Sequence, residues 1–153
     1  MKYFFYLTVM IMMLSCSSGT SSSNNSSAST DENNIIRPSA EDIKKAKESL
    51  KFLSDMENKQ LAGTQLDVMT TLASADFDGT NLVYTCVIDE DYATIETLRN
   101  TQKEVMEKNI RNTLENDPRI ESTKENLILI GGKIIYNYVG DTSNKVLTIT
   151  IGF

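Results

Sequence analysis

The sequence predicts one α+β domain, in which two helices pack on one face of a mainly antiparallel sheet of about four strands, in the order α-β-β-α-β-β. Two long stretches repeat their apolar residues every three or four positions, which is typical of helices with one buried side. Stretches follow in which β-branched and aromatic residues alternate with polar ones, which is typical of strands. This order predicts helices on one side of an antiparallel sheet.

The first helix is expected over residues 39–58. Ser39 is a good N-cap residue, and Asp42 stands three positions later, where a side chain can complete a capping box. One apolar stripe runs along this segment and comprises Ile43, Ala46, Leu50, Leu53 and Met56. Packing of this stripe on the protein's own sheet is the favoured interpretation, and docking on a partner is the alternative.

Two strands are expected next, over residues 70–76 and 81–89. Between them lies the dipeptide Asp78-Gly79, which is a strong signal for a two-residue hairpin turn of type I′. In such a turn both central residues have a positive φ angle.

A second, long helix is expected over residues 91–116, because Asp91 can begin it and the pair Asp117-Pro118 ends it. Its inward face contains three polar residues, which are Gln102, Asn109 and Thr113. In the favoured interpretation they lie over a sheet edge or bond backbone groups, and in the alternative they form a polar spot in a groove between helix and sheet.

The C-terminal segment predicts strands over residues 127–130, 133–139 and 145–151. Gly131 and Gly132 separate the first two, either as a tight turn or as a bulge within one long strand. The last two have similar lengths and are expected to form the second hairpin.

The first 16 residues resemble the signal of bacterial lipoproteins. Lys2 precedes an apolar run that is too short to cross a membrane, and Ser15 comes directly before Cys16, as in a lipobox. The resemblance implies that residues 1–15 are a signal peptide and that Cys16 becomes acylated, so that membrane lipid is a partner of the chain. A plain secretory signal, with Cys16 incidental, is the alternative.

Residues 16–37 are expected to form a flexible tether after the acylated cysteine, because Ser, Thr and Asn dominate them. The folded domain is then expected over residues 38–153. Ser17 and Ser18 stand where a retention Asp would stand, and by resemblance to the bacterial sorting rule this favours the outer membrane, facing the periplasm.

The C-terminal half resembles a group of small exported bacterial proteins of unknown function. The shared features are Thr71-Leu72, the pattern Gly79-x-x-Leu82-x-Tyr84, a long helix, and the pattern Gly132-x-x-x-Tyr136-x-Tyr138 before a terminal strand. The resemblance implies a shared small fold and carries no functional residue with it.

The composition excludes several function classes. The chain has no His, which removes the commonest general base and transition-metal ligand. It has 15 basic against 21 acidic residues, so it lacks the basic surface that nucleic-acid binding needs. Cys86 is expected to be a small buried residue without a disulfide partner. We expect no cofactor.

Two groups of carboxylates are candidates for a catalytic or metal site. The run from Asp76 to Thr80, Asp-Phe-Asp-Gly-Thr, resembles the first motif of haloacid-dehalogenase-type phosphatases, but it lacks the parallel strand and the large sheet of those enzymes. The cluster Asp89-Glu90-Asp91 does not have the spacing of a calcium loop. A turn and an acidic helix start are the favoured interpretations, so no catalytic and no metal residue is assigned.

The sequence thus leaves three functions open. The first is a membrane-tethered envelope lipoprotein that acts as a non-catalytic binding or inhibitory module towards an unidentified protein partner. The second is a structural accessory subunit of an envelope complex, which docks through a sheet edge or its first helix. The third, a carboxylate-only metal-dependent phosphatase, is the least favoured.

Overall fold

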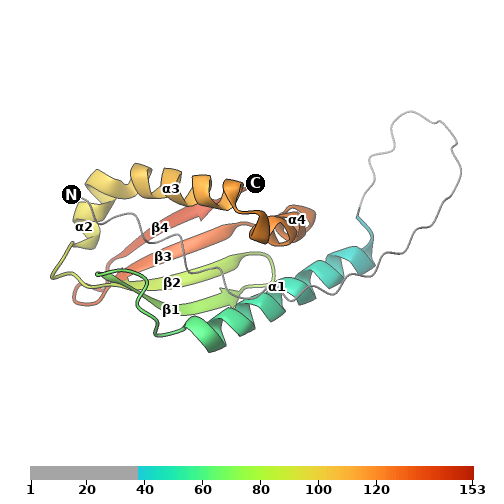
Figure 1. The fold of residues 1–153 in the computed structure, drawn as a ribbon, viewed down its shortest axis with the longest axis horizontal. Coiled ribbons are helices and arrows are strands. Elements are labelled where there is room, and N and C mark those ends of the chain that lie inside the picture. The colour runs from blue at the N-terminus through green and yellow to red at the C-terminus, as the bar shows by residue number, and fades with distance from the viewer. Residues whose placement is uncertain (1–37) are drawn as a thin grey trace, which may run out of the picture.

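The computed structural model describes residues 38–153, which form one α+β domain (Figure 1). The helical elements are α1 (Ala40–Leu61), α2 (Ile95–Thr97), a π-helical turn η1 (Leu98–Gln102), α3 (Lys103–Asn116), a 3-10 turn η2 (Pro118–Ile120) and α4 (Glu121–Ile130). The strands are β1 (Thr70–Phe77), β2 (Leu82–Ile88), β3 (Ile134–Gly140) and β4 (Val146–Ile151). The expected signal peptide, Cys16 and the expected tether lie outside the described residues.

Helix α1 begins as its sequence predicts and continues three residues further. The Ser39 hydroxyl accepts a hydrogen bond from the Asp42 amide at 3.1 Å, and the Asp42 carboxylate accepts one from the Ser39 amide at 3.3 Å. This capping box satisfies backbone donors that have no partner within the helix. The side of α1 that carries Ala46 and Leu50 is buried, so the apolar stripe packs on the protein's own sheet.

The sheet has the strand order β1-β2-β3-β4. Strands β1 and β2 pair antiparallel, as do β3 and β4, which confirms the two predicted hairpins. The hairpins join through β2 and β3, which pair in parallel. The sheet is therefore mixed and mostly antiparallel, and the element order α-β-β-α-β-β is confirmed, with one further helix before β3.

The expected strand over residues 127–130 is wrong, because these residues form the last turn of α4. A run of four apolar residues fits a buried strand and a helix equally well by periodicity. Gly131 adopts a left-handed φ of 67° and ends the helix, and the amides of Gly131 and Gly132 donate to the carbonyls of Ile128 and Leu127.

The second long helix begins later than expected and is interrupted. Thr94, and not Asp91, caps its start, because the Thr94 side chain accepts a hydrogen bond from the Thr97 amide at 3.2 Å. The π-helical turn η1 then separates α2 from α3. None of the helices within residues 38–153 is long and apolar enough to cross a membrane.

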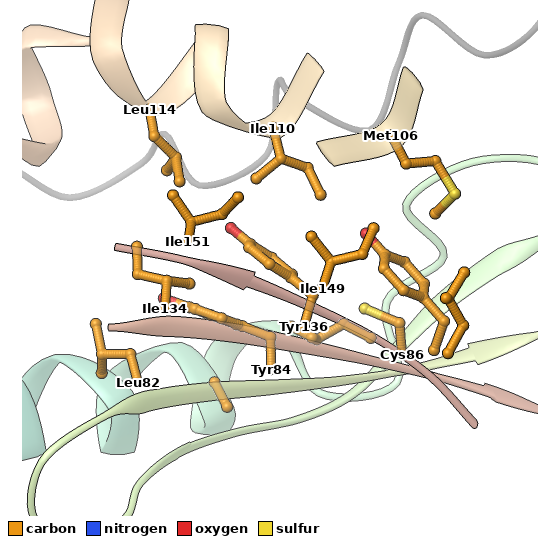
Figure 2. Close-up of a cluster of buried hydrophobic side chains, with 14 of the residues drawn as sticks. Leu82, Tyr84, Cys86, Met106, Ile110, Leu114, Ile134, Tyr136, Ile149 and Ile151 are labelled. Carbon is orange, nitrogen blue, oxygen red and sulfur yellow. The ribbon is translucent and has the colours of Figure 1, made fainter. Parts of the chain in front are cut away.

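The core lies between one face of the sheet and the helices. In Figure 1, α1 runs along β1 at one edge of the sheet and α3 runs along β4 at the other. Figure 2 shows Met106, Ile110 and Leu114 of α3 above Ile149 and Ile151 of β4. All of these side chains are buried. The other face of the sheet carries side chains that are half-buried or exposed.

Three tyrosines form a stack in the centre of this core. The rings of Tyr84 and Tyr136 are 5.2 Å apart, and those of Tyr136 and Tyr138 are 6.4 Å apart, with interplanar angles of 18° and 17°. The stack follows from the parallel register, in which Tyr84 lies opposite Tyr136. The Tyr138 hydroxyl is buried and has no hydrogen-bond partner among the described residues.

A buried acid attaches α1 to this stack. The Glu57 carboxylate, whose residue is only 7% exposed, accepts a hydrogen bond from the Tyr84 hydroxyl at 2.8 Å. Burial raises the pKa of Glu57, and the hydrogen bond from Tyr84 offsets part of this rise. The folded chain therefore binds the Glu57 proton more tightly than the unfolded chain does.

We expect Glu57→Gln to stabilise the protein at pH values above the ordinary pKa of a glutamate. Because the folded-state pKa is raised, the wild type loses stability as the pH rises from that value through the folded-state pKa. The amide keeps an acceptor for Tyr84 without a charge, so the gain is on the order of 1 kcal/mol. Thermal midpoints at about pH 5 and about pH 8 measure it. The exposed Glu48→Gln is the control, and an equal pH dependence in both variants would contradict the assignment.

Candidate functional site

A shallow groove that contains large apolar side chains lies between α1 and the β1–β2 hairpin. Its volume is about 530 Å³. It is lined by Lys47, Glu48, Lys51, Phe52, Asp55, Phe77, Asp78 and Gly79. Phe52 is 70% exposed, although it is one of the largest apolar residues of the domain. We call this hollow the α1–hairpin groove.

Two elements place aromatic rings on the groove. Phe52 lies two positions after the buried Leu50, which puts it on nearly the opposite side of α1 from the core. Phe77 is the last residue of β1 and is half-buried. The sequence gives one signal for this site, which is that the aromatic Phe52 is out of phase with the apolar stripe of its helix.

The charges on the rim of the groove are mostly paired. Lys51 donates to both carboxylate oxygens of Asp55, at 2.7 and 2.8 Å, and Lys44 lies 3.9 Å from Glu48. Lys47 forms no ion pair with another residue of the described domain. The groove therefore combines apolar rings with one unpaired cation.

The Asp-Phe-Asp-Gly-Thr run forms the loop of the β1–β2 hairpin. Asp78 accepts hydrogen bonds from the Thr80 amide at 2.8 Å and from the Asn81 amide at 2.6 Å, and its second oxygen accepts one from the Asn81 side chain at 2.9 Å. These hydrogen bonds with Asn81 and Thr80 lower the pKa of Asp78. Asp76 is exposed and accepts a hydrogen bond from Ser74 at 2.7 Å.

The predicted type I′ turn is wrong, although the hairpin is confirmed. Phe77 pairs with Leu82, so the loop has four residues and not two. Gly79 has a φ of 98°, whereas Asp78 does not have a positive φ. The Asp78 side chain bonds the loop amides itself, and this makes the longer loop possible.

The second carboxylate cluster joins two loops. The Glu90 carboxylate accepts hydrogen bonds from the Ser143 amide at 2.6 Å, from the Ser143 hydroxyl at 2.9 Å and from the Ile95 amide at 3.2 Å. These hydrogen bonds lower the pKa of Glu90, and the one from the Ser143 amide has the largest effect. Within the cluster, Asp89 accepts a hydrogen bond from the Asp91 amide at 3.0 Å. Glu90 therefore connects the loop after β2 to the turn before β4.

Hydrogen bonds run in both directions between these two loops, and the loops lie close together. Asp141 accepts a hydrogen bond from the Glu90 amide at 3.1 Å, and a Cβ atom on Gly140 would lie 2.5 Å from the Glu90 carboxyl carbon. A neighbouring hollow of about 390 Å³ is lined mainly by polar and charged residues. Within residues 38–153 no group of three His, Cys, Asp or Glu residues could hold a metal ion.

The remaining residues singled out from the sequence do not meet at one site. Thr113 donates a hydrogen bond to the Asn109 carbonyl at 3.0 Å, as the backbone-bonding interpretation expects. The expected inward position of Asn109 is wrong, because this residue is exposed, and Gln102 is half-buried at the end of η1. Cys86 is buried, and burial raises its pKa to about 12, which leaves an unreactive thiol.

Neither sheet edge is free along its length. Along β1, the Gly63 amide donates to the Leu72 carbonyl at 2.7 Å, and the Leu72 amide donates to the Thr64 carbonyl at 3.0 Å. Along β4, Arg99 donates to the Val146 carbonyl at 2.7 Å, and Arg111 donates to the Gly152 carbonyl at 3.2 Å. Such contacts hinder the addition of another strand.

Comparison with known proteins identifies the fold. No protein-family model matches the chain, and no curated protein matches it significantly. A Pseudomonas aeruginosa protein described as secreted shares the fold, with a TM-score of 0.60, 9% identity, and coverage of 75% of this chain and 96% of that one. EpsS, the pilotin of the Vibrio vulnificus type 2 secretion system, has a TM-score of 0.55 and 6% identity, with coverage of 74% of this chain and 94% of that one.

We expect Asp78→Ala to destabilise the protein by about 1 kcal/mol, because three hydrogen bonds in the hairpin loop are lost. Asp76→Ala, the matched control, removes one exposed hydrogen bond and is expected to change little. The difference should shrink as the pH falls through the lowered pKa of Asp78. Urea unfolding measures both variants. Magnesium-dependent hydrolysis of a small phosphate ester that Asp76→Ala abolishes would contradict the structural role of this loop.

Proposed function

We propose that this chain is a membrane-anchored, non-catalytic binding protein of the bacterial cell envelope. The observation that carries the proposal is the α1–hairpin groove, in which Phe52 is 70% exposed beside Phe77. Exposed aromatic rings at a hollow are typical of surfaces that bind other proteins, because they bury a large apolar area on association. A site on two packed elements is also held in a fixed shape.

The groove indicates the chemistry of the partner. An apolar side chain of the partner would fit against Phe52 and Phe77, and a neighbouring carboxylate would meet Lys47 at the rim. The partner segment that fits is therefore an apolar residue next to an acidic one. A buried aromatic contact supplies most of the affinity, and the rim charge contributes mainly to specificity.

The hydrogen bonds of the carboxylates support a non-catalytic role. In the phosphatase interpretation Asp78 would be the acid or base, but both of its oxygens accept hydrogen bonds within the hairpin loop. Glu90 is engaged in the same way by Ser143 and Ile95. Groups that hold loops together in this way are poorly placed to transfer protons to a substrate.

An accessory subunit of an envelope assembly is the second candidate function. The likeness to a pilotin, which covers 94% of that chain, favours it over an inhibitor of a secreted protein. For this function the sequence predicts a docking surface at a sheet edge or on the first helix. The apolar stripe of α1 packs in the core, so α1 would dock through Phe52 on its outer side.

The anchor we propose is Cys16, with the domain held at the outer membrane on its periplasmic side. We expect cells given an alkyne fatty acid to label the wild-type chain and to leave Cys16→Ser unlabelled, because the thiol of Cys16 carries the lipid. Cys86→Ser is the matched control and is expected to keep the label. Equal labelling of the wild type and Cys16→Ser would contradict the proposed anchor.

The groove is tested by capture from detergent-solubilised envelope with the full chain as bait. We expect Phe52→Ser to lower recovery of the specific partner at least about tenfold, as for an aromatic hot spot. Tyr92→Ser is the control, because Tyr92 is 65% exposed and follows β2 at the opposite end of the sheet. A secreted toxin or enzyme among the captured proteins supports the binding or inhibitory role, and an integral assembly supports the accessory role. Unchanged capture by Phe52→Ser would contradict the proposed site.

A further inference from the structure

The face of the sheet that the described helices leave uncovered has an unusual composition. We call it the open face, and it takes three residues from each strand: Thr71, Ser74 and Asp76; Val83, Thr85 and Val87; Ile135, Asn137 and Val139; Val146, Thr148 and Thr150. At the chain's average of 24% charged residues, about three of twelve would be charged. Only Asp76 is, and it lies on an edge strand.

The strand register arranges this face in three rows. The first row is Asp76, Val83, Ile135 and Thr150; the middle row is Ser74, Thr85, Asn137 and Thr148; the third row is Thr71, Val87, Val139 and Val146. Aliphatic side chains therefore form the centre of both outer rows, and polar side chains form the middle row. Within the middle row, Thr148 donates a hydrogen bond to Asn137 at 2.8 Å.

This pattern is complementary to itself, and we propose that the open face is the interface of a back-to-back dimer of this chain. A twofold axis along the middle row places the first row on the third, so that Asp76 faces Thr71 of the second copy. A twofold axis along the strands places the first row on itself, so that Asp76 faces Thr150 of the second copy. Either axis puts aliphatic rows together and polar rows together, as a symmetric interface requires.

Charge favours a second copy at this surface. The chain has a net charge of −6, so two copies repel each other through most of their surface. The open face carries one charged side chain, that of Asp76, and neither symmetric arrangement brings the two Asp76 carboxylates together. Stacked sheets of this kind pack about 10 Å apart with aligned strands.

The size of the face predicts a reversible dimer. The open face is four strands wide, at about 4.8 Å per strand, and about seven residues long, at about 3.3 Å per residue. Its area is therefore roughly 440 Å² per copy. A stable complex buries about 800 Å² per partner, so association is expected to be weak and to depend on concentration. The interface is separate from the α1–hairpin groove, and it does not depend on the proposed function.

Sedimentation equilibrium of the full chain in detergent, from about 10 µM to about 1 mM, tests the proposal. We expect a reversible monomer–dimer equilibrium in the wild type, and loss of the dimer in Thr85→Arg, which places a charge in the middle row. Ser122→Arg on the exposed side of α4 is the matched control and is expected to leave the dimer intact. A wild type that stays monomeric throughout, or a dimer that survives Thr85→Arg, would overturn the proposal.

Cysteine cross-linking provides a second readout if Thr85→Arg does not fold. When the axis follows the middle row, position 85 of one copy faces position 85 of the second copy. When the axis follows the strands, position 85 of one copy faces position 137 of the second copy. Thr85→Cys alone is therefore expected to form a disulfide-linked dimer on mild oxidation in the first arrangement, and a mixture of Thr85→Cys chains with Asn137→Cys chains is expected to do so in the second. The two cysteines stay on separate chains because Thr85 and Asn137 are neighbours in the sheet and could otherwise join within one chain. Ser122→Cys is the control, and cross-linking no greater than that of the control in both samples would contradict the interface.

Discussion

Strands β2 and β3 pair in parallel, with Tyr84 opposite Tyr136 and Cys86 opposite Tyr138, and the rest of the structure depends on this pairing. Parallel neighbours need a long crossover connection, and α2, η1, α3 and α4 supply it. The crossover packs on the same face as α1, so that face becomes the core and encloses the tyrosine stack. The opposite face receives no described helix, and Asp76 is the only charged residue among the twelve that its strands place there.

This arrangement separates the residues that stabilise the fold from those available for binding. Most of the carboxylates that stand out in the sequence lie in loops, where Asp78 closes the hairpin and Glu90 joins two ends of the chain through Ser143. Glu57 is buried, accepts a hydrogen bond from the Tyr84 hydroxyl and so attaches α1 to the sheet. The surface of the described domain also carries the α1–hairpin groove and the open face, on which Asp76 is the only charged side chain.

The sequence predicted the parts of the fold that depend on local chemistry. The capping box at Ser39, both hairpins and the single covered face follow from short-range patterns. The pairing of β2 with β3 joins segments about 50 residues apart, and no local pattern reports it. The run 127–130 is too short for periodicity to separate helix from strand. The groove could not be predicted in this way, because it also needs Phe77 of the hairpin and no local pattern places the hairpin beside Phe52.

Hydroxyl-radical footprinting of the chain in native envelope membranes, compared with the purified chain, tests the binding role most directly. Phe52 and Tyr92 have similar exposure in the free domain, at 70% and 65%, so Tyr92 serves as the internal reference. If the chain is a binding protein that uses the α1–hairpin groove, oxidation of Phe52 relative to Tyr92 falls in the membranes, because a partner covers the groove. An unchanged ratio of Phe52 to Tyr92 oxidation in the two samples would contradict the account.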